Sequence, residues 1–439
     1  MRIKDNSTYA KSDFISRFPK LAQMISDKTL ADLSENNNFL IFPKHLVASE
    51  DLENDSKIIE TINDQALTHN VIGIVGTGKE RLVIHSRFSK GSDNFFLRYI
   101  LQKVLNINLI NMDSSLSIEE QYYQLLIYLF PKYLNAAMRK GLFKTYRRFK
   151  YNDANLKGPI EIARQIKSNT PFVGKIAYST REFSKDNELM ELIRHTIEYI
   201  KTSTYGETML LNLTERTKQN VQAVVQNTFN YSPMERRKII AANRVNPIRH
   251  AYYSEYRALQ KLCLMILTQK NHSFGKRQLE FYGILFDVSW LWEEYLSLLL
   301  KEQFVHPRNR KKQLGFKLYA EMFENHNNRK VYPDFYSKEH KIVLDAKYKK
   351  IDTSISRSDL YQIITYAHIF KAQAAGLIYP SNLEMKNHLI GELNGNPTKI
   401  FRQAFQVPQN VTSYQEFVEK FRISEKTVLE ELMKVVDQN

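Results

Sequence analysis

The residue pattern between positions 281 and 380 constrains the fold more than any other feature of this 439-residue chain. Its apolar residues repeat first with a helical period, then with a strand period, then with a helical period again. The predicted segments are a helix in VSWLWEEYLSLLLKEQF, strands in GFKLYAEMF, VYPDFYS and IVLDAKYK, a helix in RSDLYQIITYAHIF and a buried strand in AGLIYP. A sheet with helices on its faces would bury the apolar side of every segment. The sequence therefore predicts an α/β domain here, in a chain that is α+β overall.

Two of these predicted strands carry an acid where an apolar residue is expected. Asp334 follows Pro333, and Asp345 lies inside the apolar run IVLDA. Strand interiors disfavour Asp. If the hairpin turn is centred on residues 339–340, Asp334 lies opposite Asp345, with the two Cβ atoms about 5 Å apart on one face. Lys347, two residues further on, points the same way.

Two carboxylates this close repel one another unless a cation lies between them. Mg²⁺ suits such a site, because it is held by one or two carboxylates together with water and substrate phosphate. Lys347 would then orient the attacking water or stabilise the charge that develops in the transition state. The alternative is structural: Asp334 ends a strand, Asp345 pairs with Lys347, and the hairpin is solvated. The apolar context of Asp345 and the matching register favour the metal site.

Pro333-Asp334, ten residues and then Asp345-Ala346-Lys347 resembles the signature of the PD-(D/E)XK nuclease superfamily. The resemblance implies a restriction-endonuclease-like domain that cleaves phosphodiester bonds. It also implies Asp334, Asp345 and Lys347 as catalytic residues. Mg²⁺ or Mn²⁺ would be bound at Asp334, Asp345 and Ala346.

Such nucleases often carry a Glu on the preceding helix and a Gln and a Tyr, four residues apart, on the following helix. Glu293 and Glu294 in WLWEEYL are candidates for the first, and Glu293 is preferred because it directly follows an aromatic residue. Gln362 and Tyr366 match the second, and helical spacing places them on the same face as Asp359. Without the resemblance, the polar flank of a helix explains this pair equally well.

Within this superfamily, the sequence resembles one family in particular. FDVSWLWEEYL, YPDFYSKEHKIVLDAKYK, SDLYQIITYAHIF and AGLIYP together resemble McrC, the nuclease subunit of McrBC-type restriction systems, and its LlaJI-like relatives. LKGPIEI and REFSKDNELMELIRHTI are similar to segments that precede the nuclease domain there. The resemblance is good from about 150 to 380, and it is loose over residues 1–110 and in the tail. It implies a partner, an McrB-like AAA+ GTPase, which recognises DNA and whose GTP hydrolysis the nuclease subunit stimulates.

GIVGTGKE, at residues 73–80, matches the first seven positions of a phosphate-binding loop. The eighth position is Glu80, where a Ser or Thr is needed to reach magnesium. The following RLVIHSRF alternates like a strand, whereas a phosphate-binding loop opens a helix. A Gly-rich hairpin turn is therefore predicted, and the chain itself is not expected to hydrolyse nucleotides.

The chain has 63 Lys and Arg against 47 Asp and Glu, a net charge of +16. This excess favours a polyanionic partner, with nucleic acid first and a solvated Lys-rich surface as the alternative. Arg139, Arg147 and Arg148 are candidates for contacts with phosphate, DNA or the partner; a basic helix face in solvent explains them at least as well.

Cys263 is the only cysteine, which excludes an internal disulfide and favours a reducing compartment. The N-terminus has no apolar core of signal-peptide length. No apolar run approaches the ~18 residues of a membrane span. We therefore expect a soluble, cytoplasmic protein.

Three regions are expected: a mixed α/β domain at 1–155 that docks on the motor, a mainly helical region at 156–280, and the nuclease domain with a helical tail at 281–439. In the middle region, NELMELIRHTIEYI is a predicted amphipathic helix with Asp186 as its cap. Two other functions compete with the restriction nuclease: a non-catalytic adaptor that couples a motor to DNA, and a RecB-like repair nuclease. Every expected catalytic position holds a competent residue, which argues against the adaptor.

Overall fold

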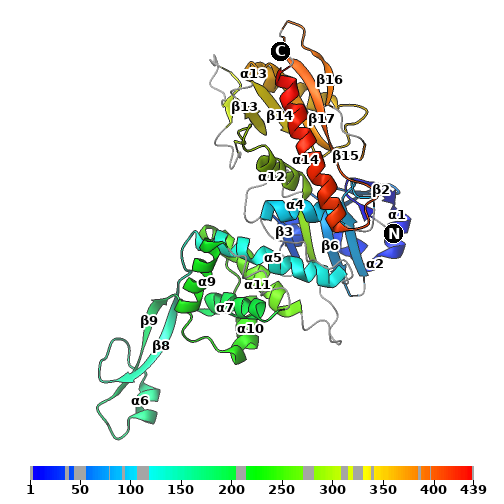
Figure 1. Ribbon diagram of the computed structural model, residues 1–439. Coiled ribbons are helices and arrows are strands. Elements are labelled where there is room, and N and C mark those ends of the chain that lie inside the picture. Colours follow the sequence, from blue (N-terminus) through cyan, green and yellow to red (C-terminus); the bar gives the residue numbers. More distant parts are fainter. Residues whose placement is uncertain are drawn as a thin grey trace. The chain divides into compact units, whose positions relative to one another are not determined.

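The computed structural model divides the chain into two compact units (Figure 1). Unit 1 combines Met1–Tyr122 with Arg277–Asn439, and unit 2 is Tyr123–Lys276. The two ends of the sequence therefore fold together. The expected boundary at 155 falls inside unit 2, and the one at 280 lies close to the return to unit 1. The structure describes residues 3–34, 39–43, 56–78, 80–90, 94–105, 118–203, 214–269, 281–307, 315–319, 330–337, 341–383, 387–395 and 397–437.

The first sheet of unit 1 joins strands from both ends of the sequence. Its order is β1 (Ile3–Lys4), β7 (Glu80–His85), β6 (Val71–Thr77), β10 (Tyr282–Asp287) and β3 (Phe39–Phe42). Strand β10 runs antiparallel to β6 and parallel to β3. The predicted strands in FLIFPKHLV, VIGIVGTG and RLVIHSRF are confirmed within the described residues, whereas β10 was not predicted. A segment almost 200 residues further along the chain thus completes this sheet.

The predicted hairpin turn in GIVGTGKE is confirmed. Strands β6 and β7 are antiparallel, with Thr77 paired to Glu80. Gly78 has a φ of 58°, which glycine adopts without steric cost; Lys79 lies outside the described residues. The Glu80 carboxylate accepts hydrogen bonds from two backbone N–H groups in the first turn of α2 (Pro19–Ile25). The acid that is incompatible with a phosphate-binding loop therefore caps a helix.

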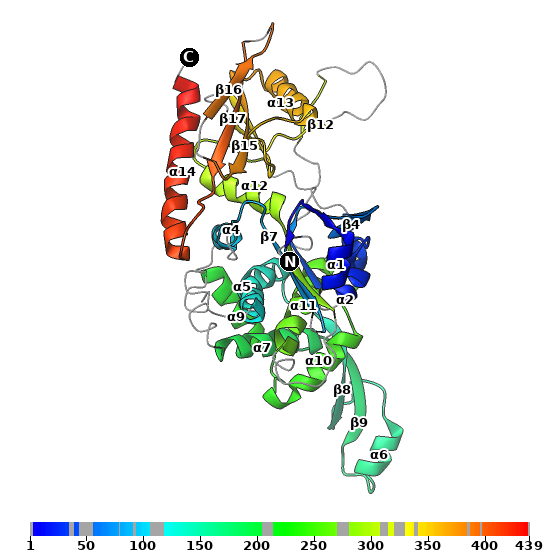
Figure 2. The same ribbon diagram turned by 90° about the vertical axis from the view of Figure 1, so that its right-hand side faces the viewer.

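The second sheet of unit 1 contains the predicted hairpin. Its order is β13 (Phe335–Ser337), β14 (Ile342–Ala346), β15 (Ala374–Ser381), β17 (Lys399–Gln406) and β16 (Asn387–Glu392). The three central strands are parallel, and each edge strand is antiparallel to its neighbour. Helix α13 (Arg357–Phe370) packs on β14 and β15, and α14 (Tyr414–Asp437) packs on β17 from the opposite face (Figure 2). The tail is helical, as predicted, and residues 414–437 form a single helix.

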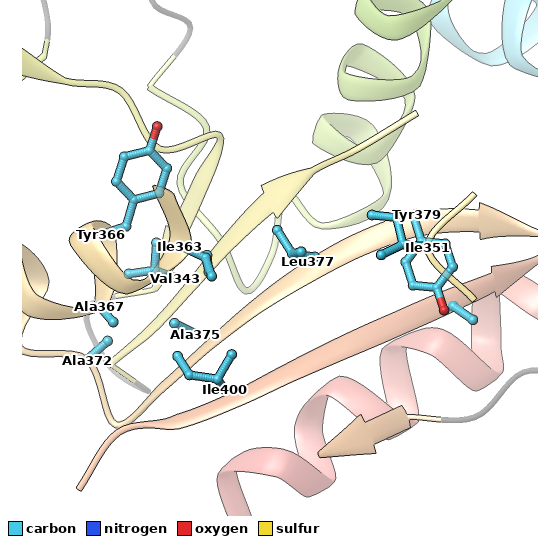
Figure 3. Packing of buried hydrophobic residues seen from close by; sticks show 11 residues of the cluster. Val343, Ile351, Ile363, Tyr366, Ala367, Ala372, Ala375, Leu377, Tyr379 and Ile400 are labelled. Atoms are coloured by element: carbon cyan, nitrogen blue, oxygen red, sulfur yellow. The ribbon is translucent and has the colours of Figure 1, made fainter. Parts of the chain in front are cut away.

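Apolar side chains fill the space between α13 and this sheet (Figure 3). Val343, Leu377 and Ile400 come from three adjacent strands, and Ile363 and Ala367 come from the helix. Because parallel strands are covered on both faces, they have nearly continuous apolar sequences. This explains the runs IVL and GLI, and it makes the acid at position 345 exceptional.

The remaining elements of unit 1 are short, apart from helices α4 and α12. They are β2 (Thr8–Ala10), α1 (Lys11–Arg17), α3 (Leu30–Ser34), β4 (Ile59–Ile62), β5 (Gln65–Thr68), α4 (Phe95–Leu105), α12 (Val288–Leu299), β11 (Phe316–Lys317) and β12 (Lys330–Val331). Strands β2, β5 and β4 form a three-stranded sheet, and β11 pairs with β12. None of the helices that the structure describes has the length and hydropathy of a membrane span.

Unit 2 consists of helices and one long two-stranded ribbon (Figure 1). The elements are α5 (Ile118–Met138), which begins in unit 1, β8 (Thr145–Asp153), α6 (Ile162–Ser168), β9 (Ile176–Ser184), α7 (Glu188–Lys201), α9 (Glu215–Asn227), α10 (Arg236–Val245) and α11 (Ser254–Gln269).

Two details of unit 2 differ from the sequence prediction. The alternative of a basic helix face is wrong for Arg147 and Arg148, because residues 145–153 form β8, paired along its whole length with β9. Asp186 does not cap α7. The cap is Asn187, whose side chain accepts a hydrogen bond from the backbone of Met190, while Asp186 accepts one from the backbone of Asn230.

Candidate functional site

The register of β13 and β14 agrees with the predicted pairing. Phe335 is paired with Leu344, so continuing the ladder by one residue places Asp334 opposite Asp345. The predicted turn at residues 339–340 lies outside the described residues. Oδ2 of Asp334 accepts a hydrogen bond of 2.6 Å from the backbone N–H of Ala346. The structure therefore brings both carboxyl groups to the same end of β14.

Lys347 lies beside these acids. Its Nζ is 2.6 Å from Oδ2 of Asp345. Its backbone N–H donates to the carbonyl of Ile378 at 2.9 Å, so the ladder with β15 continues past the end of β14. In extended backbone, side chains two residues apart share a face. This is why Asp345 and Lys347 project together.

Helix α13 supplies the polar groups that hold Lys347. Nζ of Lys347 donates to Oε1 of Gln362 at 2.9 Å, and Nε2 of Gln362 donates to the hydroxyl of Tyr366 at 2.8 Å. That hydroxyl donates in turn to the carbonyl of Tyr332, two residues before Asp334, at 3.0 Å. The Gln and Tyr therefore form one chain of hydrogen bonds from the lysine back to the start of the hairpin.

Asp359 completes this face of α13. Its Oδ1 is 3.8 Å from Nζ of Lys347 and 2.9 Å from Nζ of Lys349. Although burial raises its pKa, hydrogen bonds from the helix-capping Ser356 and from Lys349 outweigh burial and lower it overall. Asp359 therefore stays ionised and adds a second negative charge near Lys347.

Helix α12 brings a fourth acid, Glu293, to the site. Oε1 of Glu293 is 3.4 Å from Nε2 of His306, and Nδ1 of His306 lies 2.7 Å from the carbonyl oxygen of Asp334. A carbonyl only accepts, so Nδ1 carries a proton. The ring of Phe335 packs 5.0 Å from the imidazole. Sequence reasoning missed His306, because a single histidine after a helix belongs to no recognisable pattern.

The acids carry more negative charge than the lysine offsets. Burial raises the pKa of Asp334 well above its ordinary value, and the carboxylates of Asp345 and Glu293 raise it further. Burial also raises the pKa of Asp345, although Lys347 opposes this shift. Burial alone would lower the pKa of Lys347, but the adjacent carboxylates outweigh it and keep the lysine protonated.

The donor set fits a small, hard cation. Oδ2 of Asp345 is buried and lies 2.6 Å from Nζ of Lys347, its partner in an ion pair. Among the described residues, no group of three or more His, Cys, Asp or Glu side chains is arranged to hold a metal ion. Two carboxylates are nevertheless enough for Mg²⁺ or Mn²⁺, because water and phosphate oxygens complete their coordination.

The three arginines singled out from the sequence lie in unit 2. Arg147 and Arg148 are on β8, where the first is 3.3 Å from Glu191 and the second 3.1 Å from Glu161. Arg139 directly follows α5. Contacts of these residues with phosphate, DNA or a partner stay predictions.

Comparison with known proteins finds a matching family and solved structures of similar complexes. Residues 66–380 match the family described as McrBC 5-methylcytosine restriction system component. No curated protein matches the chain. A half-complex from the tetradecameric assembly of Thermococcus gammatolerans McrB AAA+ hexamers with bound McrC is 17% identical, covering 98% of this chain and 99% of that chain, with a TM-score of 0.47. The Thermococcus gammatolerans McrBC complex is 14% identical, covering 69% of this chain and 87% of that chain, with a TM-score of 0.30.

Proposed function

Since this chain belongs to the family of McrBC 5-methylcytosine restriction system components, we propose that it is the nuclease subunit of such a system. It would hydrolyse phosphodiester bonds of DNA with Mg²⁺ or Mn²⁺. The observation that carries this proposal is the pairing of Asp334 with Asp345 at the end of β14, beside Lys347.

In this proposal the second sheet of unit 1 is a PD-(D/E)XK nuclease core. Helix α12 precedes the hairpin, the hairpin carries the two acids and the lysine, and α13 leads into β15. Glu293, Gln362 and Tyr366 stand at the positions expected for the accessory residues. The contacts that connect all three to the hairpin support this assignment.

Asp334 and Asp345, with the backbone of Ala346, would hold the metal ion. The bound ion would draw charge from a phosphate oxygen and lower the pKa of a coordinated water. Lys347 is protonated and offers a fixed positive charge where negative charge develops on the phosphate. Gln362 and Tyr366 keep its ammonium group in place, because hydrogen bonds join all three side chains. Glu293 adds negative charge beside Asp334 and so favours a cation there.

We also propose an McrB-like AAA+ GTPase as the partner, with its GTP hydrolysis stimulated by this chain. In the Thermococcus gammatolerans half-complex, McrC is bound to McrB AAA+ hexamers. A motor partner would supply the nucleotide chemistry, because the phosphate-loop-like stretch of this chain is a β-hairpin turn. The net charge of +16 suits a protein that works on DNA.

The test is Asp345→Ala in the full chain, assembled with the GTPase partner. DNA cleavage should fall by about 10³-fold or more, because the metal loses a ligand and Lys347 loses its ion pair. Stimulation of GTP hydrolysis should persist, since Asp345 lies outside residues 1–155, which are expected to dock on the motor. The matched control is Glu392→Ala, an exposed acid on the edge strand β16 of the same sheet, which should cleave like the wild type.

The same experiment separates the alternatives. Cleavage by Asp345→Ala at the wild-type rate would eliminate this site. A wild-type chain that stimulates the GTPase but never cuts DNA would instead be the adaptor. Cleavage that needs Asp345 but neither GTP nor a partner would identify a repair-type nuclease.

A further inference from the structure

Tyr348 directly follows the proposed catalytic lysine and points away from it. The ladder bond from the backbone of Lys347 to Ile378 keeps the chain extended, so consecutive side chains project to opposite faces. The side chain of Lys347 meets α13, whereas Tyr348 is 4% exposed and packs against residues from the first 100 positions.

The socket around Tyr348 comes from the segment that follows β7 and from the start of α4. Its hydroxyl lies 2.6 Å from Oγ of Ser86. Its ring meets Phe88 edge-on at 5.0 Å and stacks on Phe96 at 6.4 Å. The guanidinium of Arg87 lies 4.9 Å from the ring centroid, within range of a cation–π interaction.

The socket is itself rigidly held. Arg87 forms a buried ion pair with Asp5, with its Nη2 2.8 Å from Oδ2 of the acid, and it donates to the side chain of Asn70. Oγ of Ser86 also accepts a hydrogen bond of 3.2 Å from the backbone of Phe88. The first sheet therefore fixes the position of the Tyr348 side chain.

Helix α12 is held by the same part of the chain. Oε1 of Glu425 on α14 accepts hydrogen bonds of 2.8 Å from the hydroxyls of both Tyr99 on α4 and Tyr295 on α12. Tyr295 lies two residues after Glu293. The segments that carry Lys347 and Glu293 thus both rest on α4 or the loop before it.

We propose that Tyr348 is a positioning residue, which transmits the placement of the N-terminal sheet to Lys347 through its bond to Ser86. This inference rests on the proposed nuclease function only where it concerns DNA cleavage. The positioning of the end of β14 by Tyr348 does not depend on any activity. The placement of Lys347 would then depend on Ser86, Phe88 and Phe96, which contact Tyr348.

The test uses Tyr348→Phe and Ser86→Ala in the full chain, with hydrogen–deuterium exchange at the Lys347 amide as the first readout. Tyr348→Phe keeps the ring and loses one hydrogen bond, so exchange should accelerate roughly fivefold. Ser86→Ala should accelerate it more, because it leaves a buried tyrosine hydroxyl unpaired. The double variant should exchange no faster than Ser86→Ala, because both changes break the same bond.

The second readout is the kinetics of DNA cleavage. In each variant kcat should fall by roughly the factor by which exchange at the Lys347 amide accelerates, while KM for DNA stays unchanged. Tyr256→Phe is the matched control, because it removes a buried tyrosine hydroxyl that donates to Gly141 in unit 2; neither readout should move.

Wild-type exchange at Lys347 in both Tyr348→Phe and Ser86→Ala would overturn the proposal, and so would faster exchange with unchanged kcat. If the wild type cleaves no DNA and the exchange still accelerates, the proposed function fails and the positioning of the strand end stands.

Discussion

The two five-stranded sheets of unit 1 each bury an Asp, but the surroundings of these acids differ. In the first sheet, Asp5 is fully buried, and every neighbouring group that acts on it favours its charged form: Arg87 pairs with it through both backbone and side chain. In the second sheet, Lys347 favours the charged form of Asp345, but Asp359 opposes it, and the charges of Asp345 and Glu293 in turn raise the pKa of Asp334.

The difference separates a structural acid from a functional one. A buried ion pair with satisfied hydrogen bonds is complete, and it fixes one arrangement of the chain. A buried group of acids with surplus negative charge is incomplete and gains free energy when a cation arrives. The same residue type in a similar sheet thus serves two purposes, and its neighbours decide which one.

The largest effect should follow removal of the lysine. Lys347→Ala should lower kcat for DNA cleavage by about 10³-fold, because a preorganised charge at the phosphate is lost. Single-turnover cleavage of linear DNA at saturating enzyme measures this. Lys350→Ala, an exposed lysine three residues further on, is the control and should stay near the wild-type rate. Equal losses of kcat in both variants would mean that the overall positive charge, and not a charge at position 347, supports cleavage.

Arg87→Ala should damage the first sheet in a different way. Removing the arginine leaves Asp5 buried and unpaired, which should lower the free energy of unfolding by about 3–5 kcal/mol. Denaturant unfolding measures this, with Lys57→Ala as the control, because Lys57 pairs with Glu60 in a more exposed position. The control should lose far less stability, because an exposed ion pair contributes little. A small loss in Arg87→Ala would contradict the structural role of this pair.

Asp334→Asn should stabilise the metal-free protein at neutral pH. The raised pKa of Asp334 means that the folded state binds its proton more tightly than the unfolded state does, so stability falls as pH rises toward that pKa. Asn removes this charge but keeps an oxygen for the Ala346 N–H. In EDTA, the variant should melt a few degrees above the wild type at pH 8, with a smaller difference at pH 5.

Added Mg²⁺ should then raise the melting temperature of the wild type and leave that of Asp334→Asn unchanged. A variant that melts below the wild type at pH 8 in EDTA would show that the carboxylate is stabilising, and the surplus of negative charge would be ruled out.

Sequence reasoning succeeded where the determining contacts are local. The hairpin register follows from strand alternation over a dozen residues, and α13 begins and ends at its predicted residues, with Ser356 as cap. Gln362 and Tyr366 face Lys347 because helical spacing fixes which residues share a side. These elements depend on neighbours in the sequence, so a single sequence contains the information.

Sequence reasoning failed where the contacting residues are far apart in the sequence. Strand β10 pairs with β3 and β6 across more than 200 residues, and nothing in its own sequence names those partners. The same holds for His306 and for the socket of Tyr348, whose roles arise only once separate segments meet. Strand β8 was misjudged because its charged residues hide the alternation of its faces.

The most direct test of the account is a titration of the full chain with Mn²⁺, followed by electron paramagnetic resonance, in the wild type and in Asp345→Asn. One Mn²⁺ ion should bind per wild-type chain, and the affinity should fall at least tenfold when the charge of this ligand is removed. Glu392→Gln, on the far edge of the same sheet, should bind Mn²⁺ like the wild type. Equal Mn²⁺ binding by the wild type and Asp345→Asn would contradict a metal centre between the two acids.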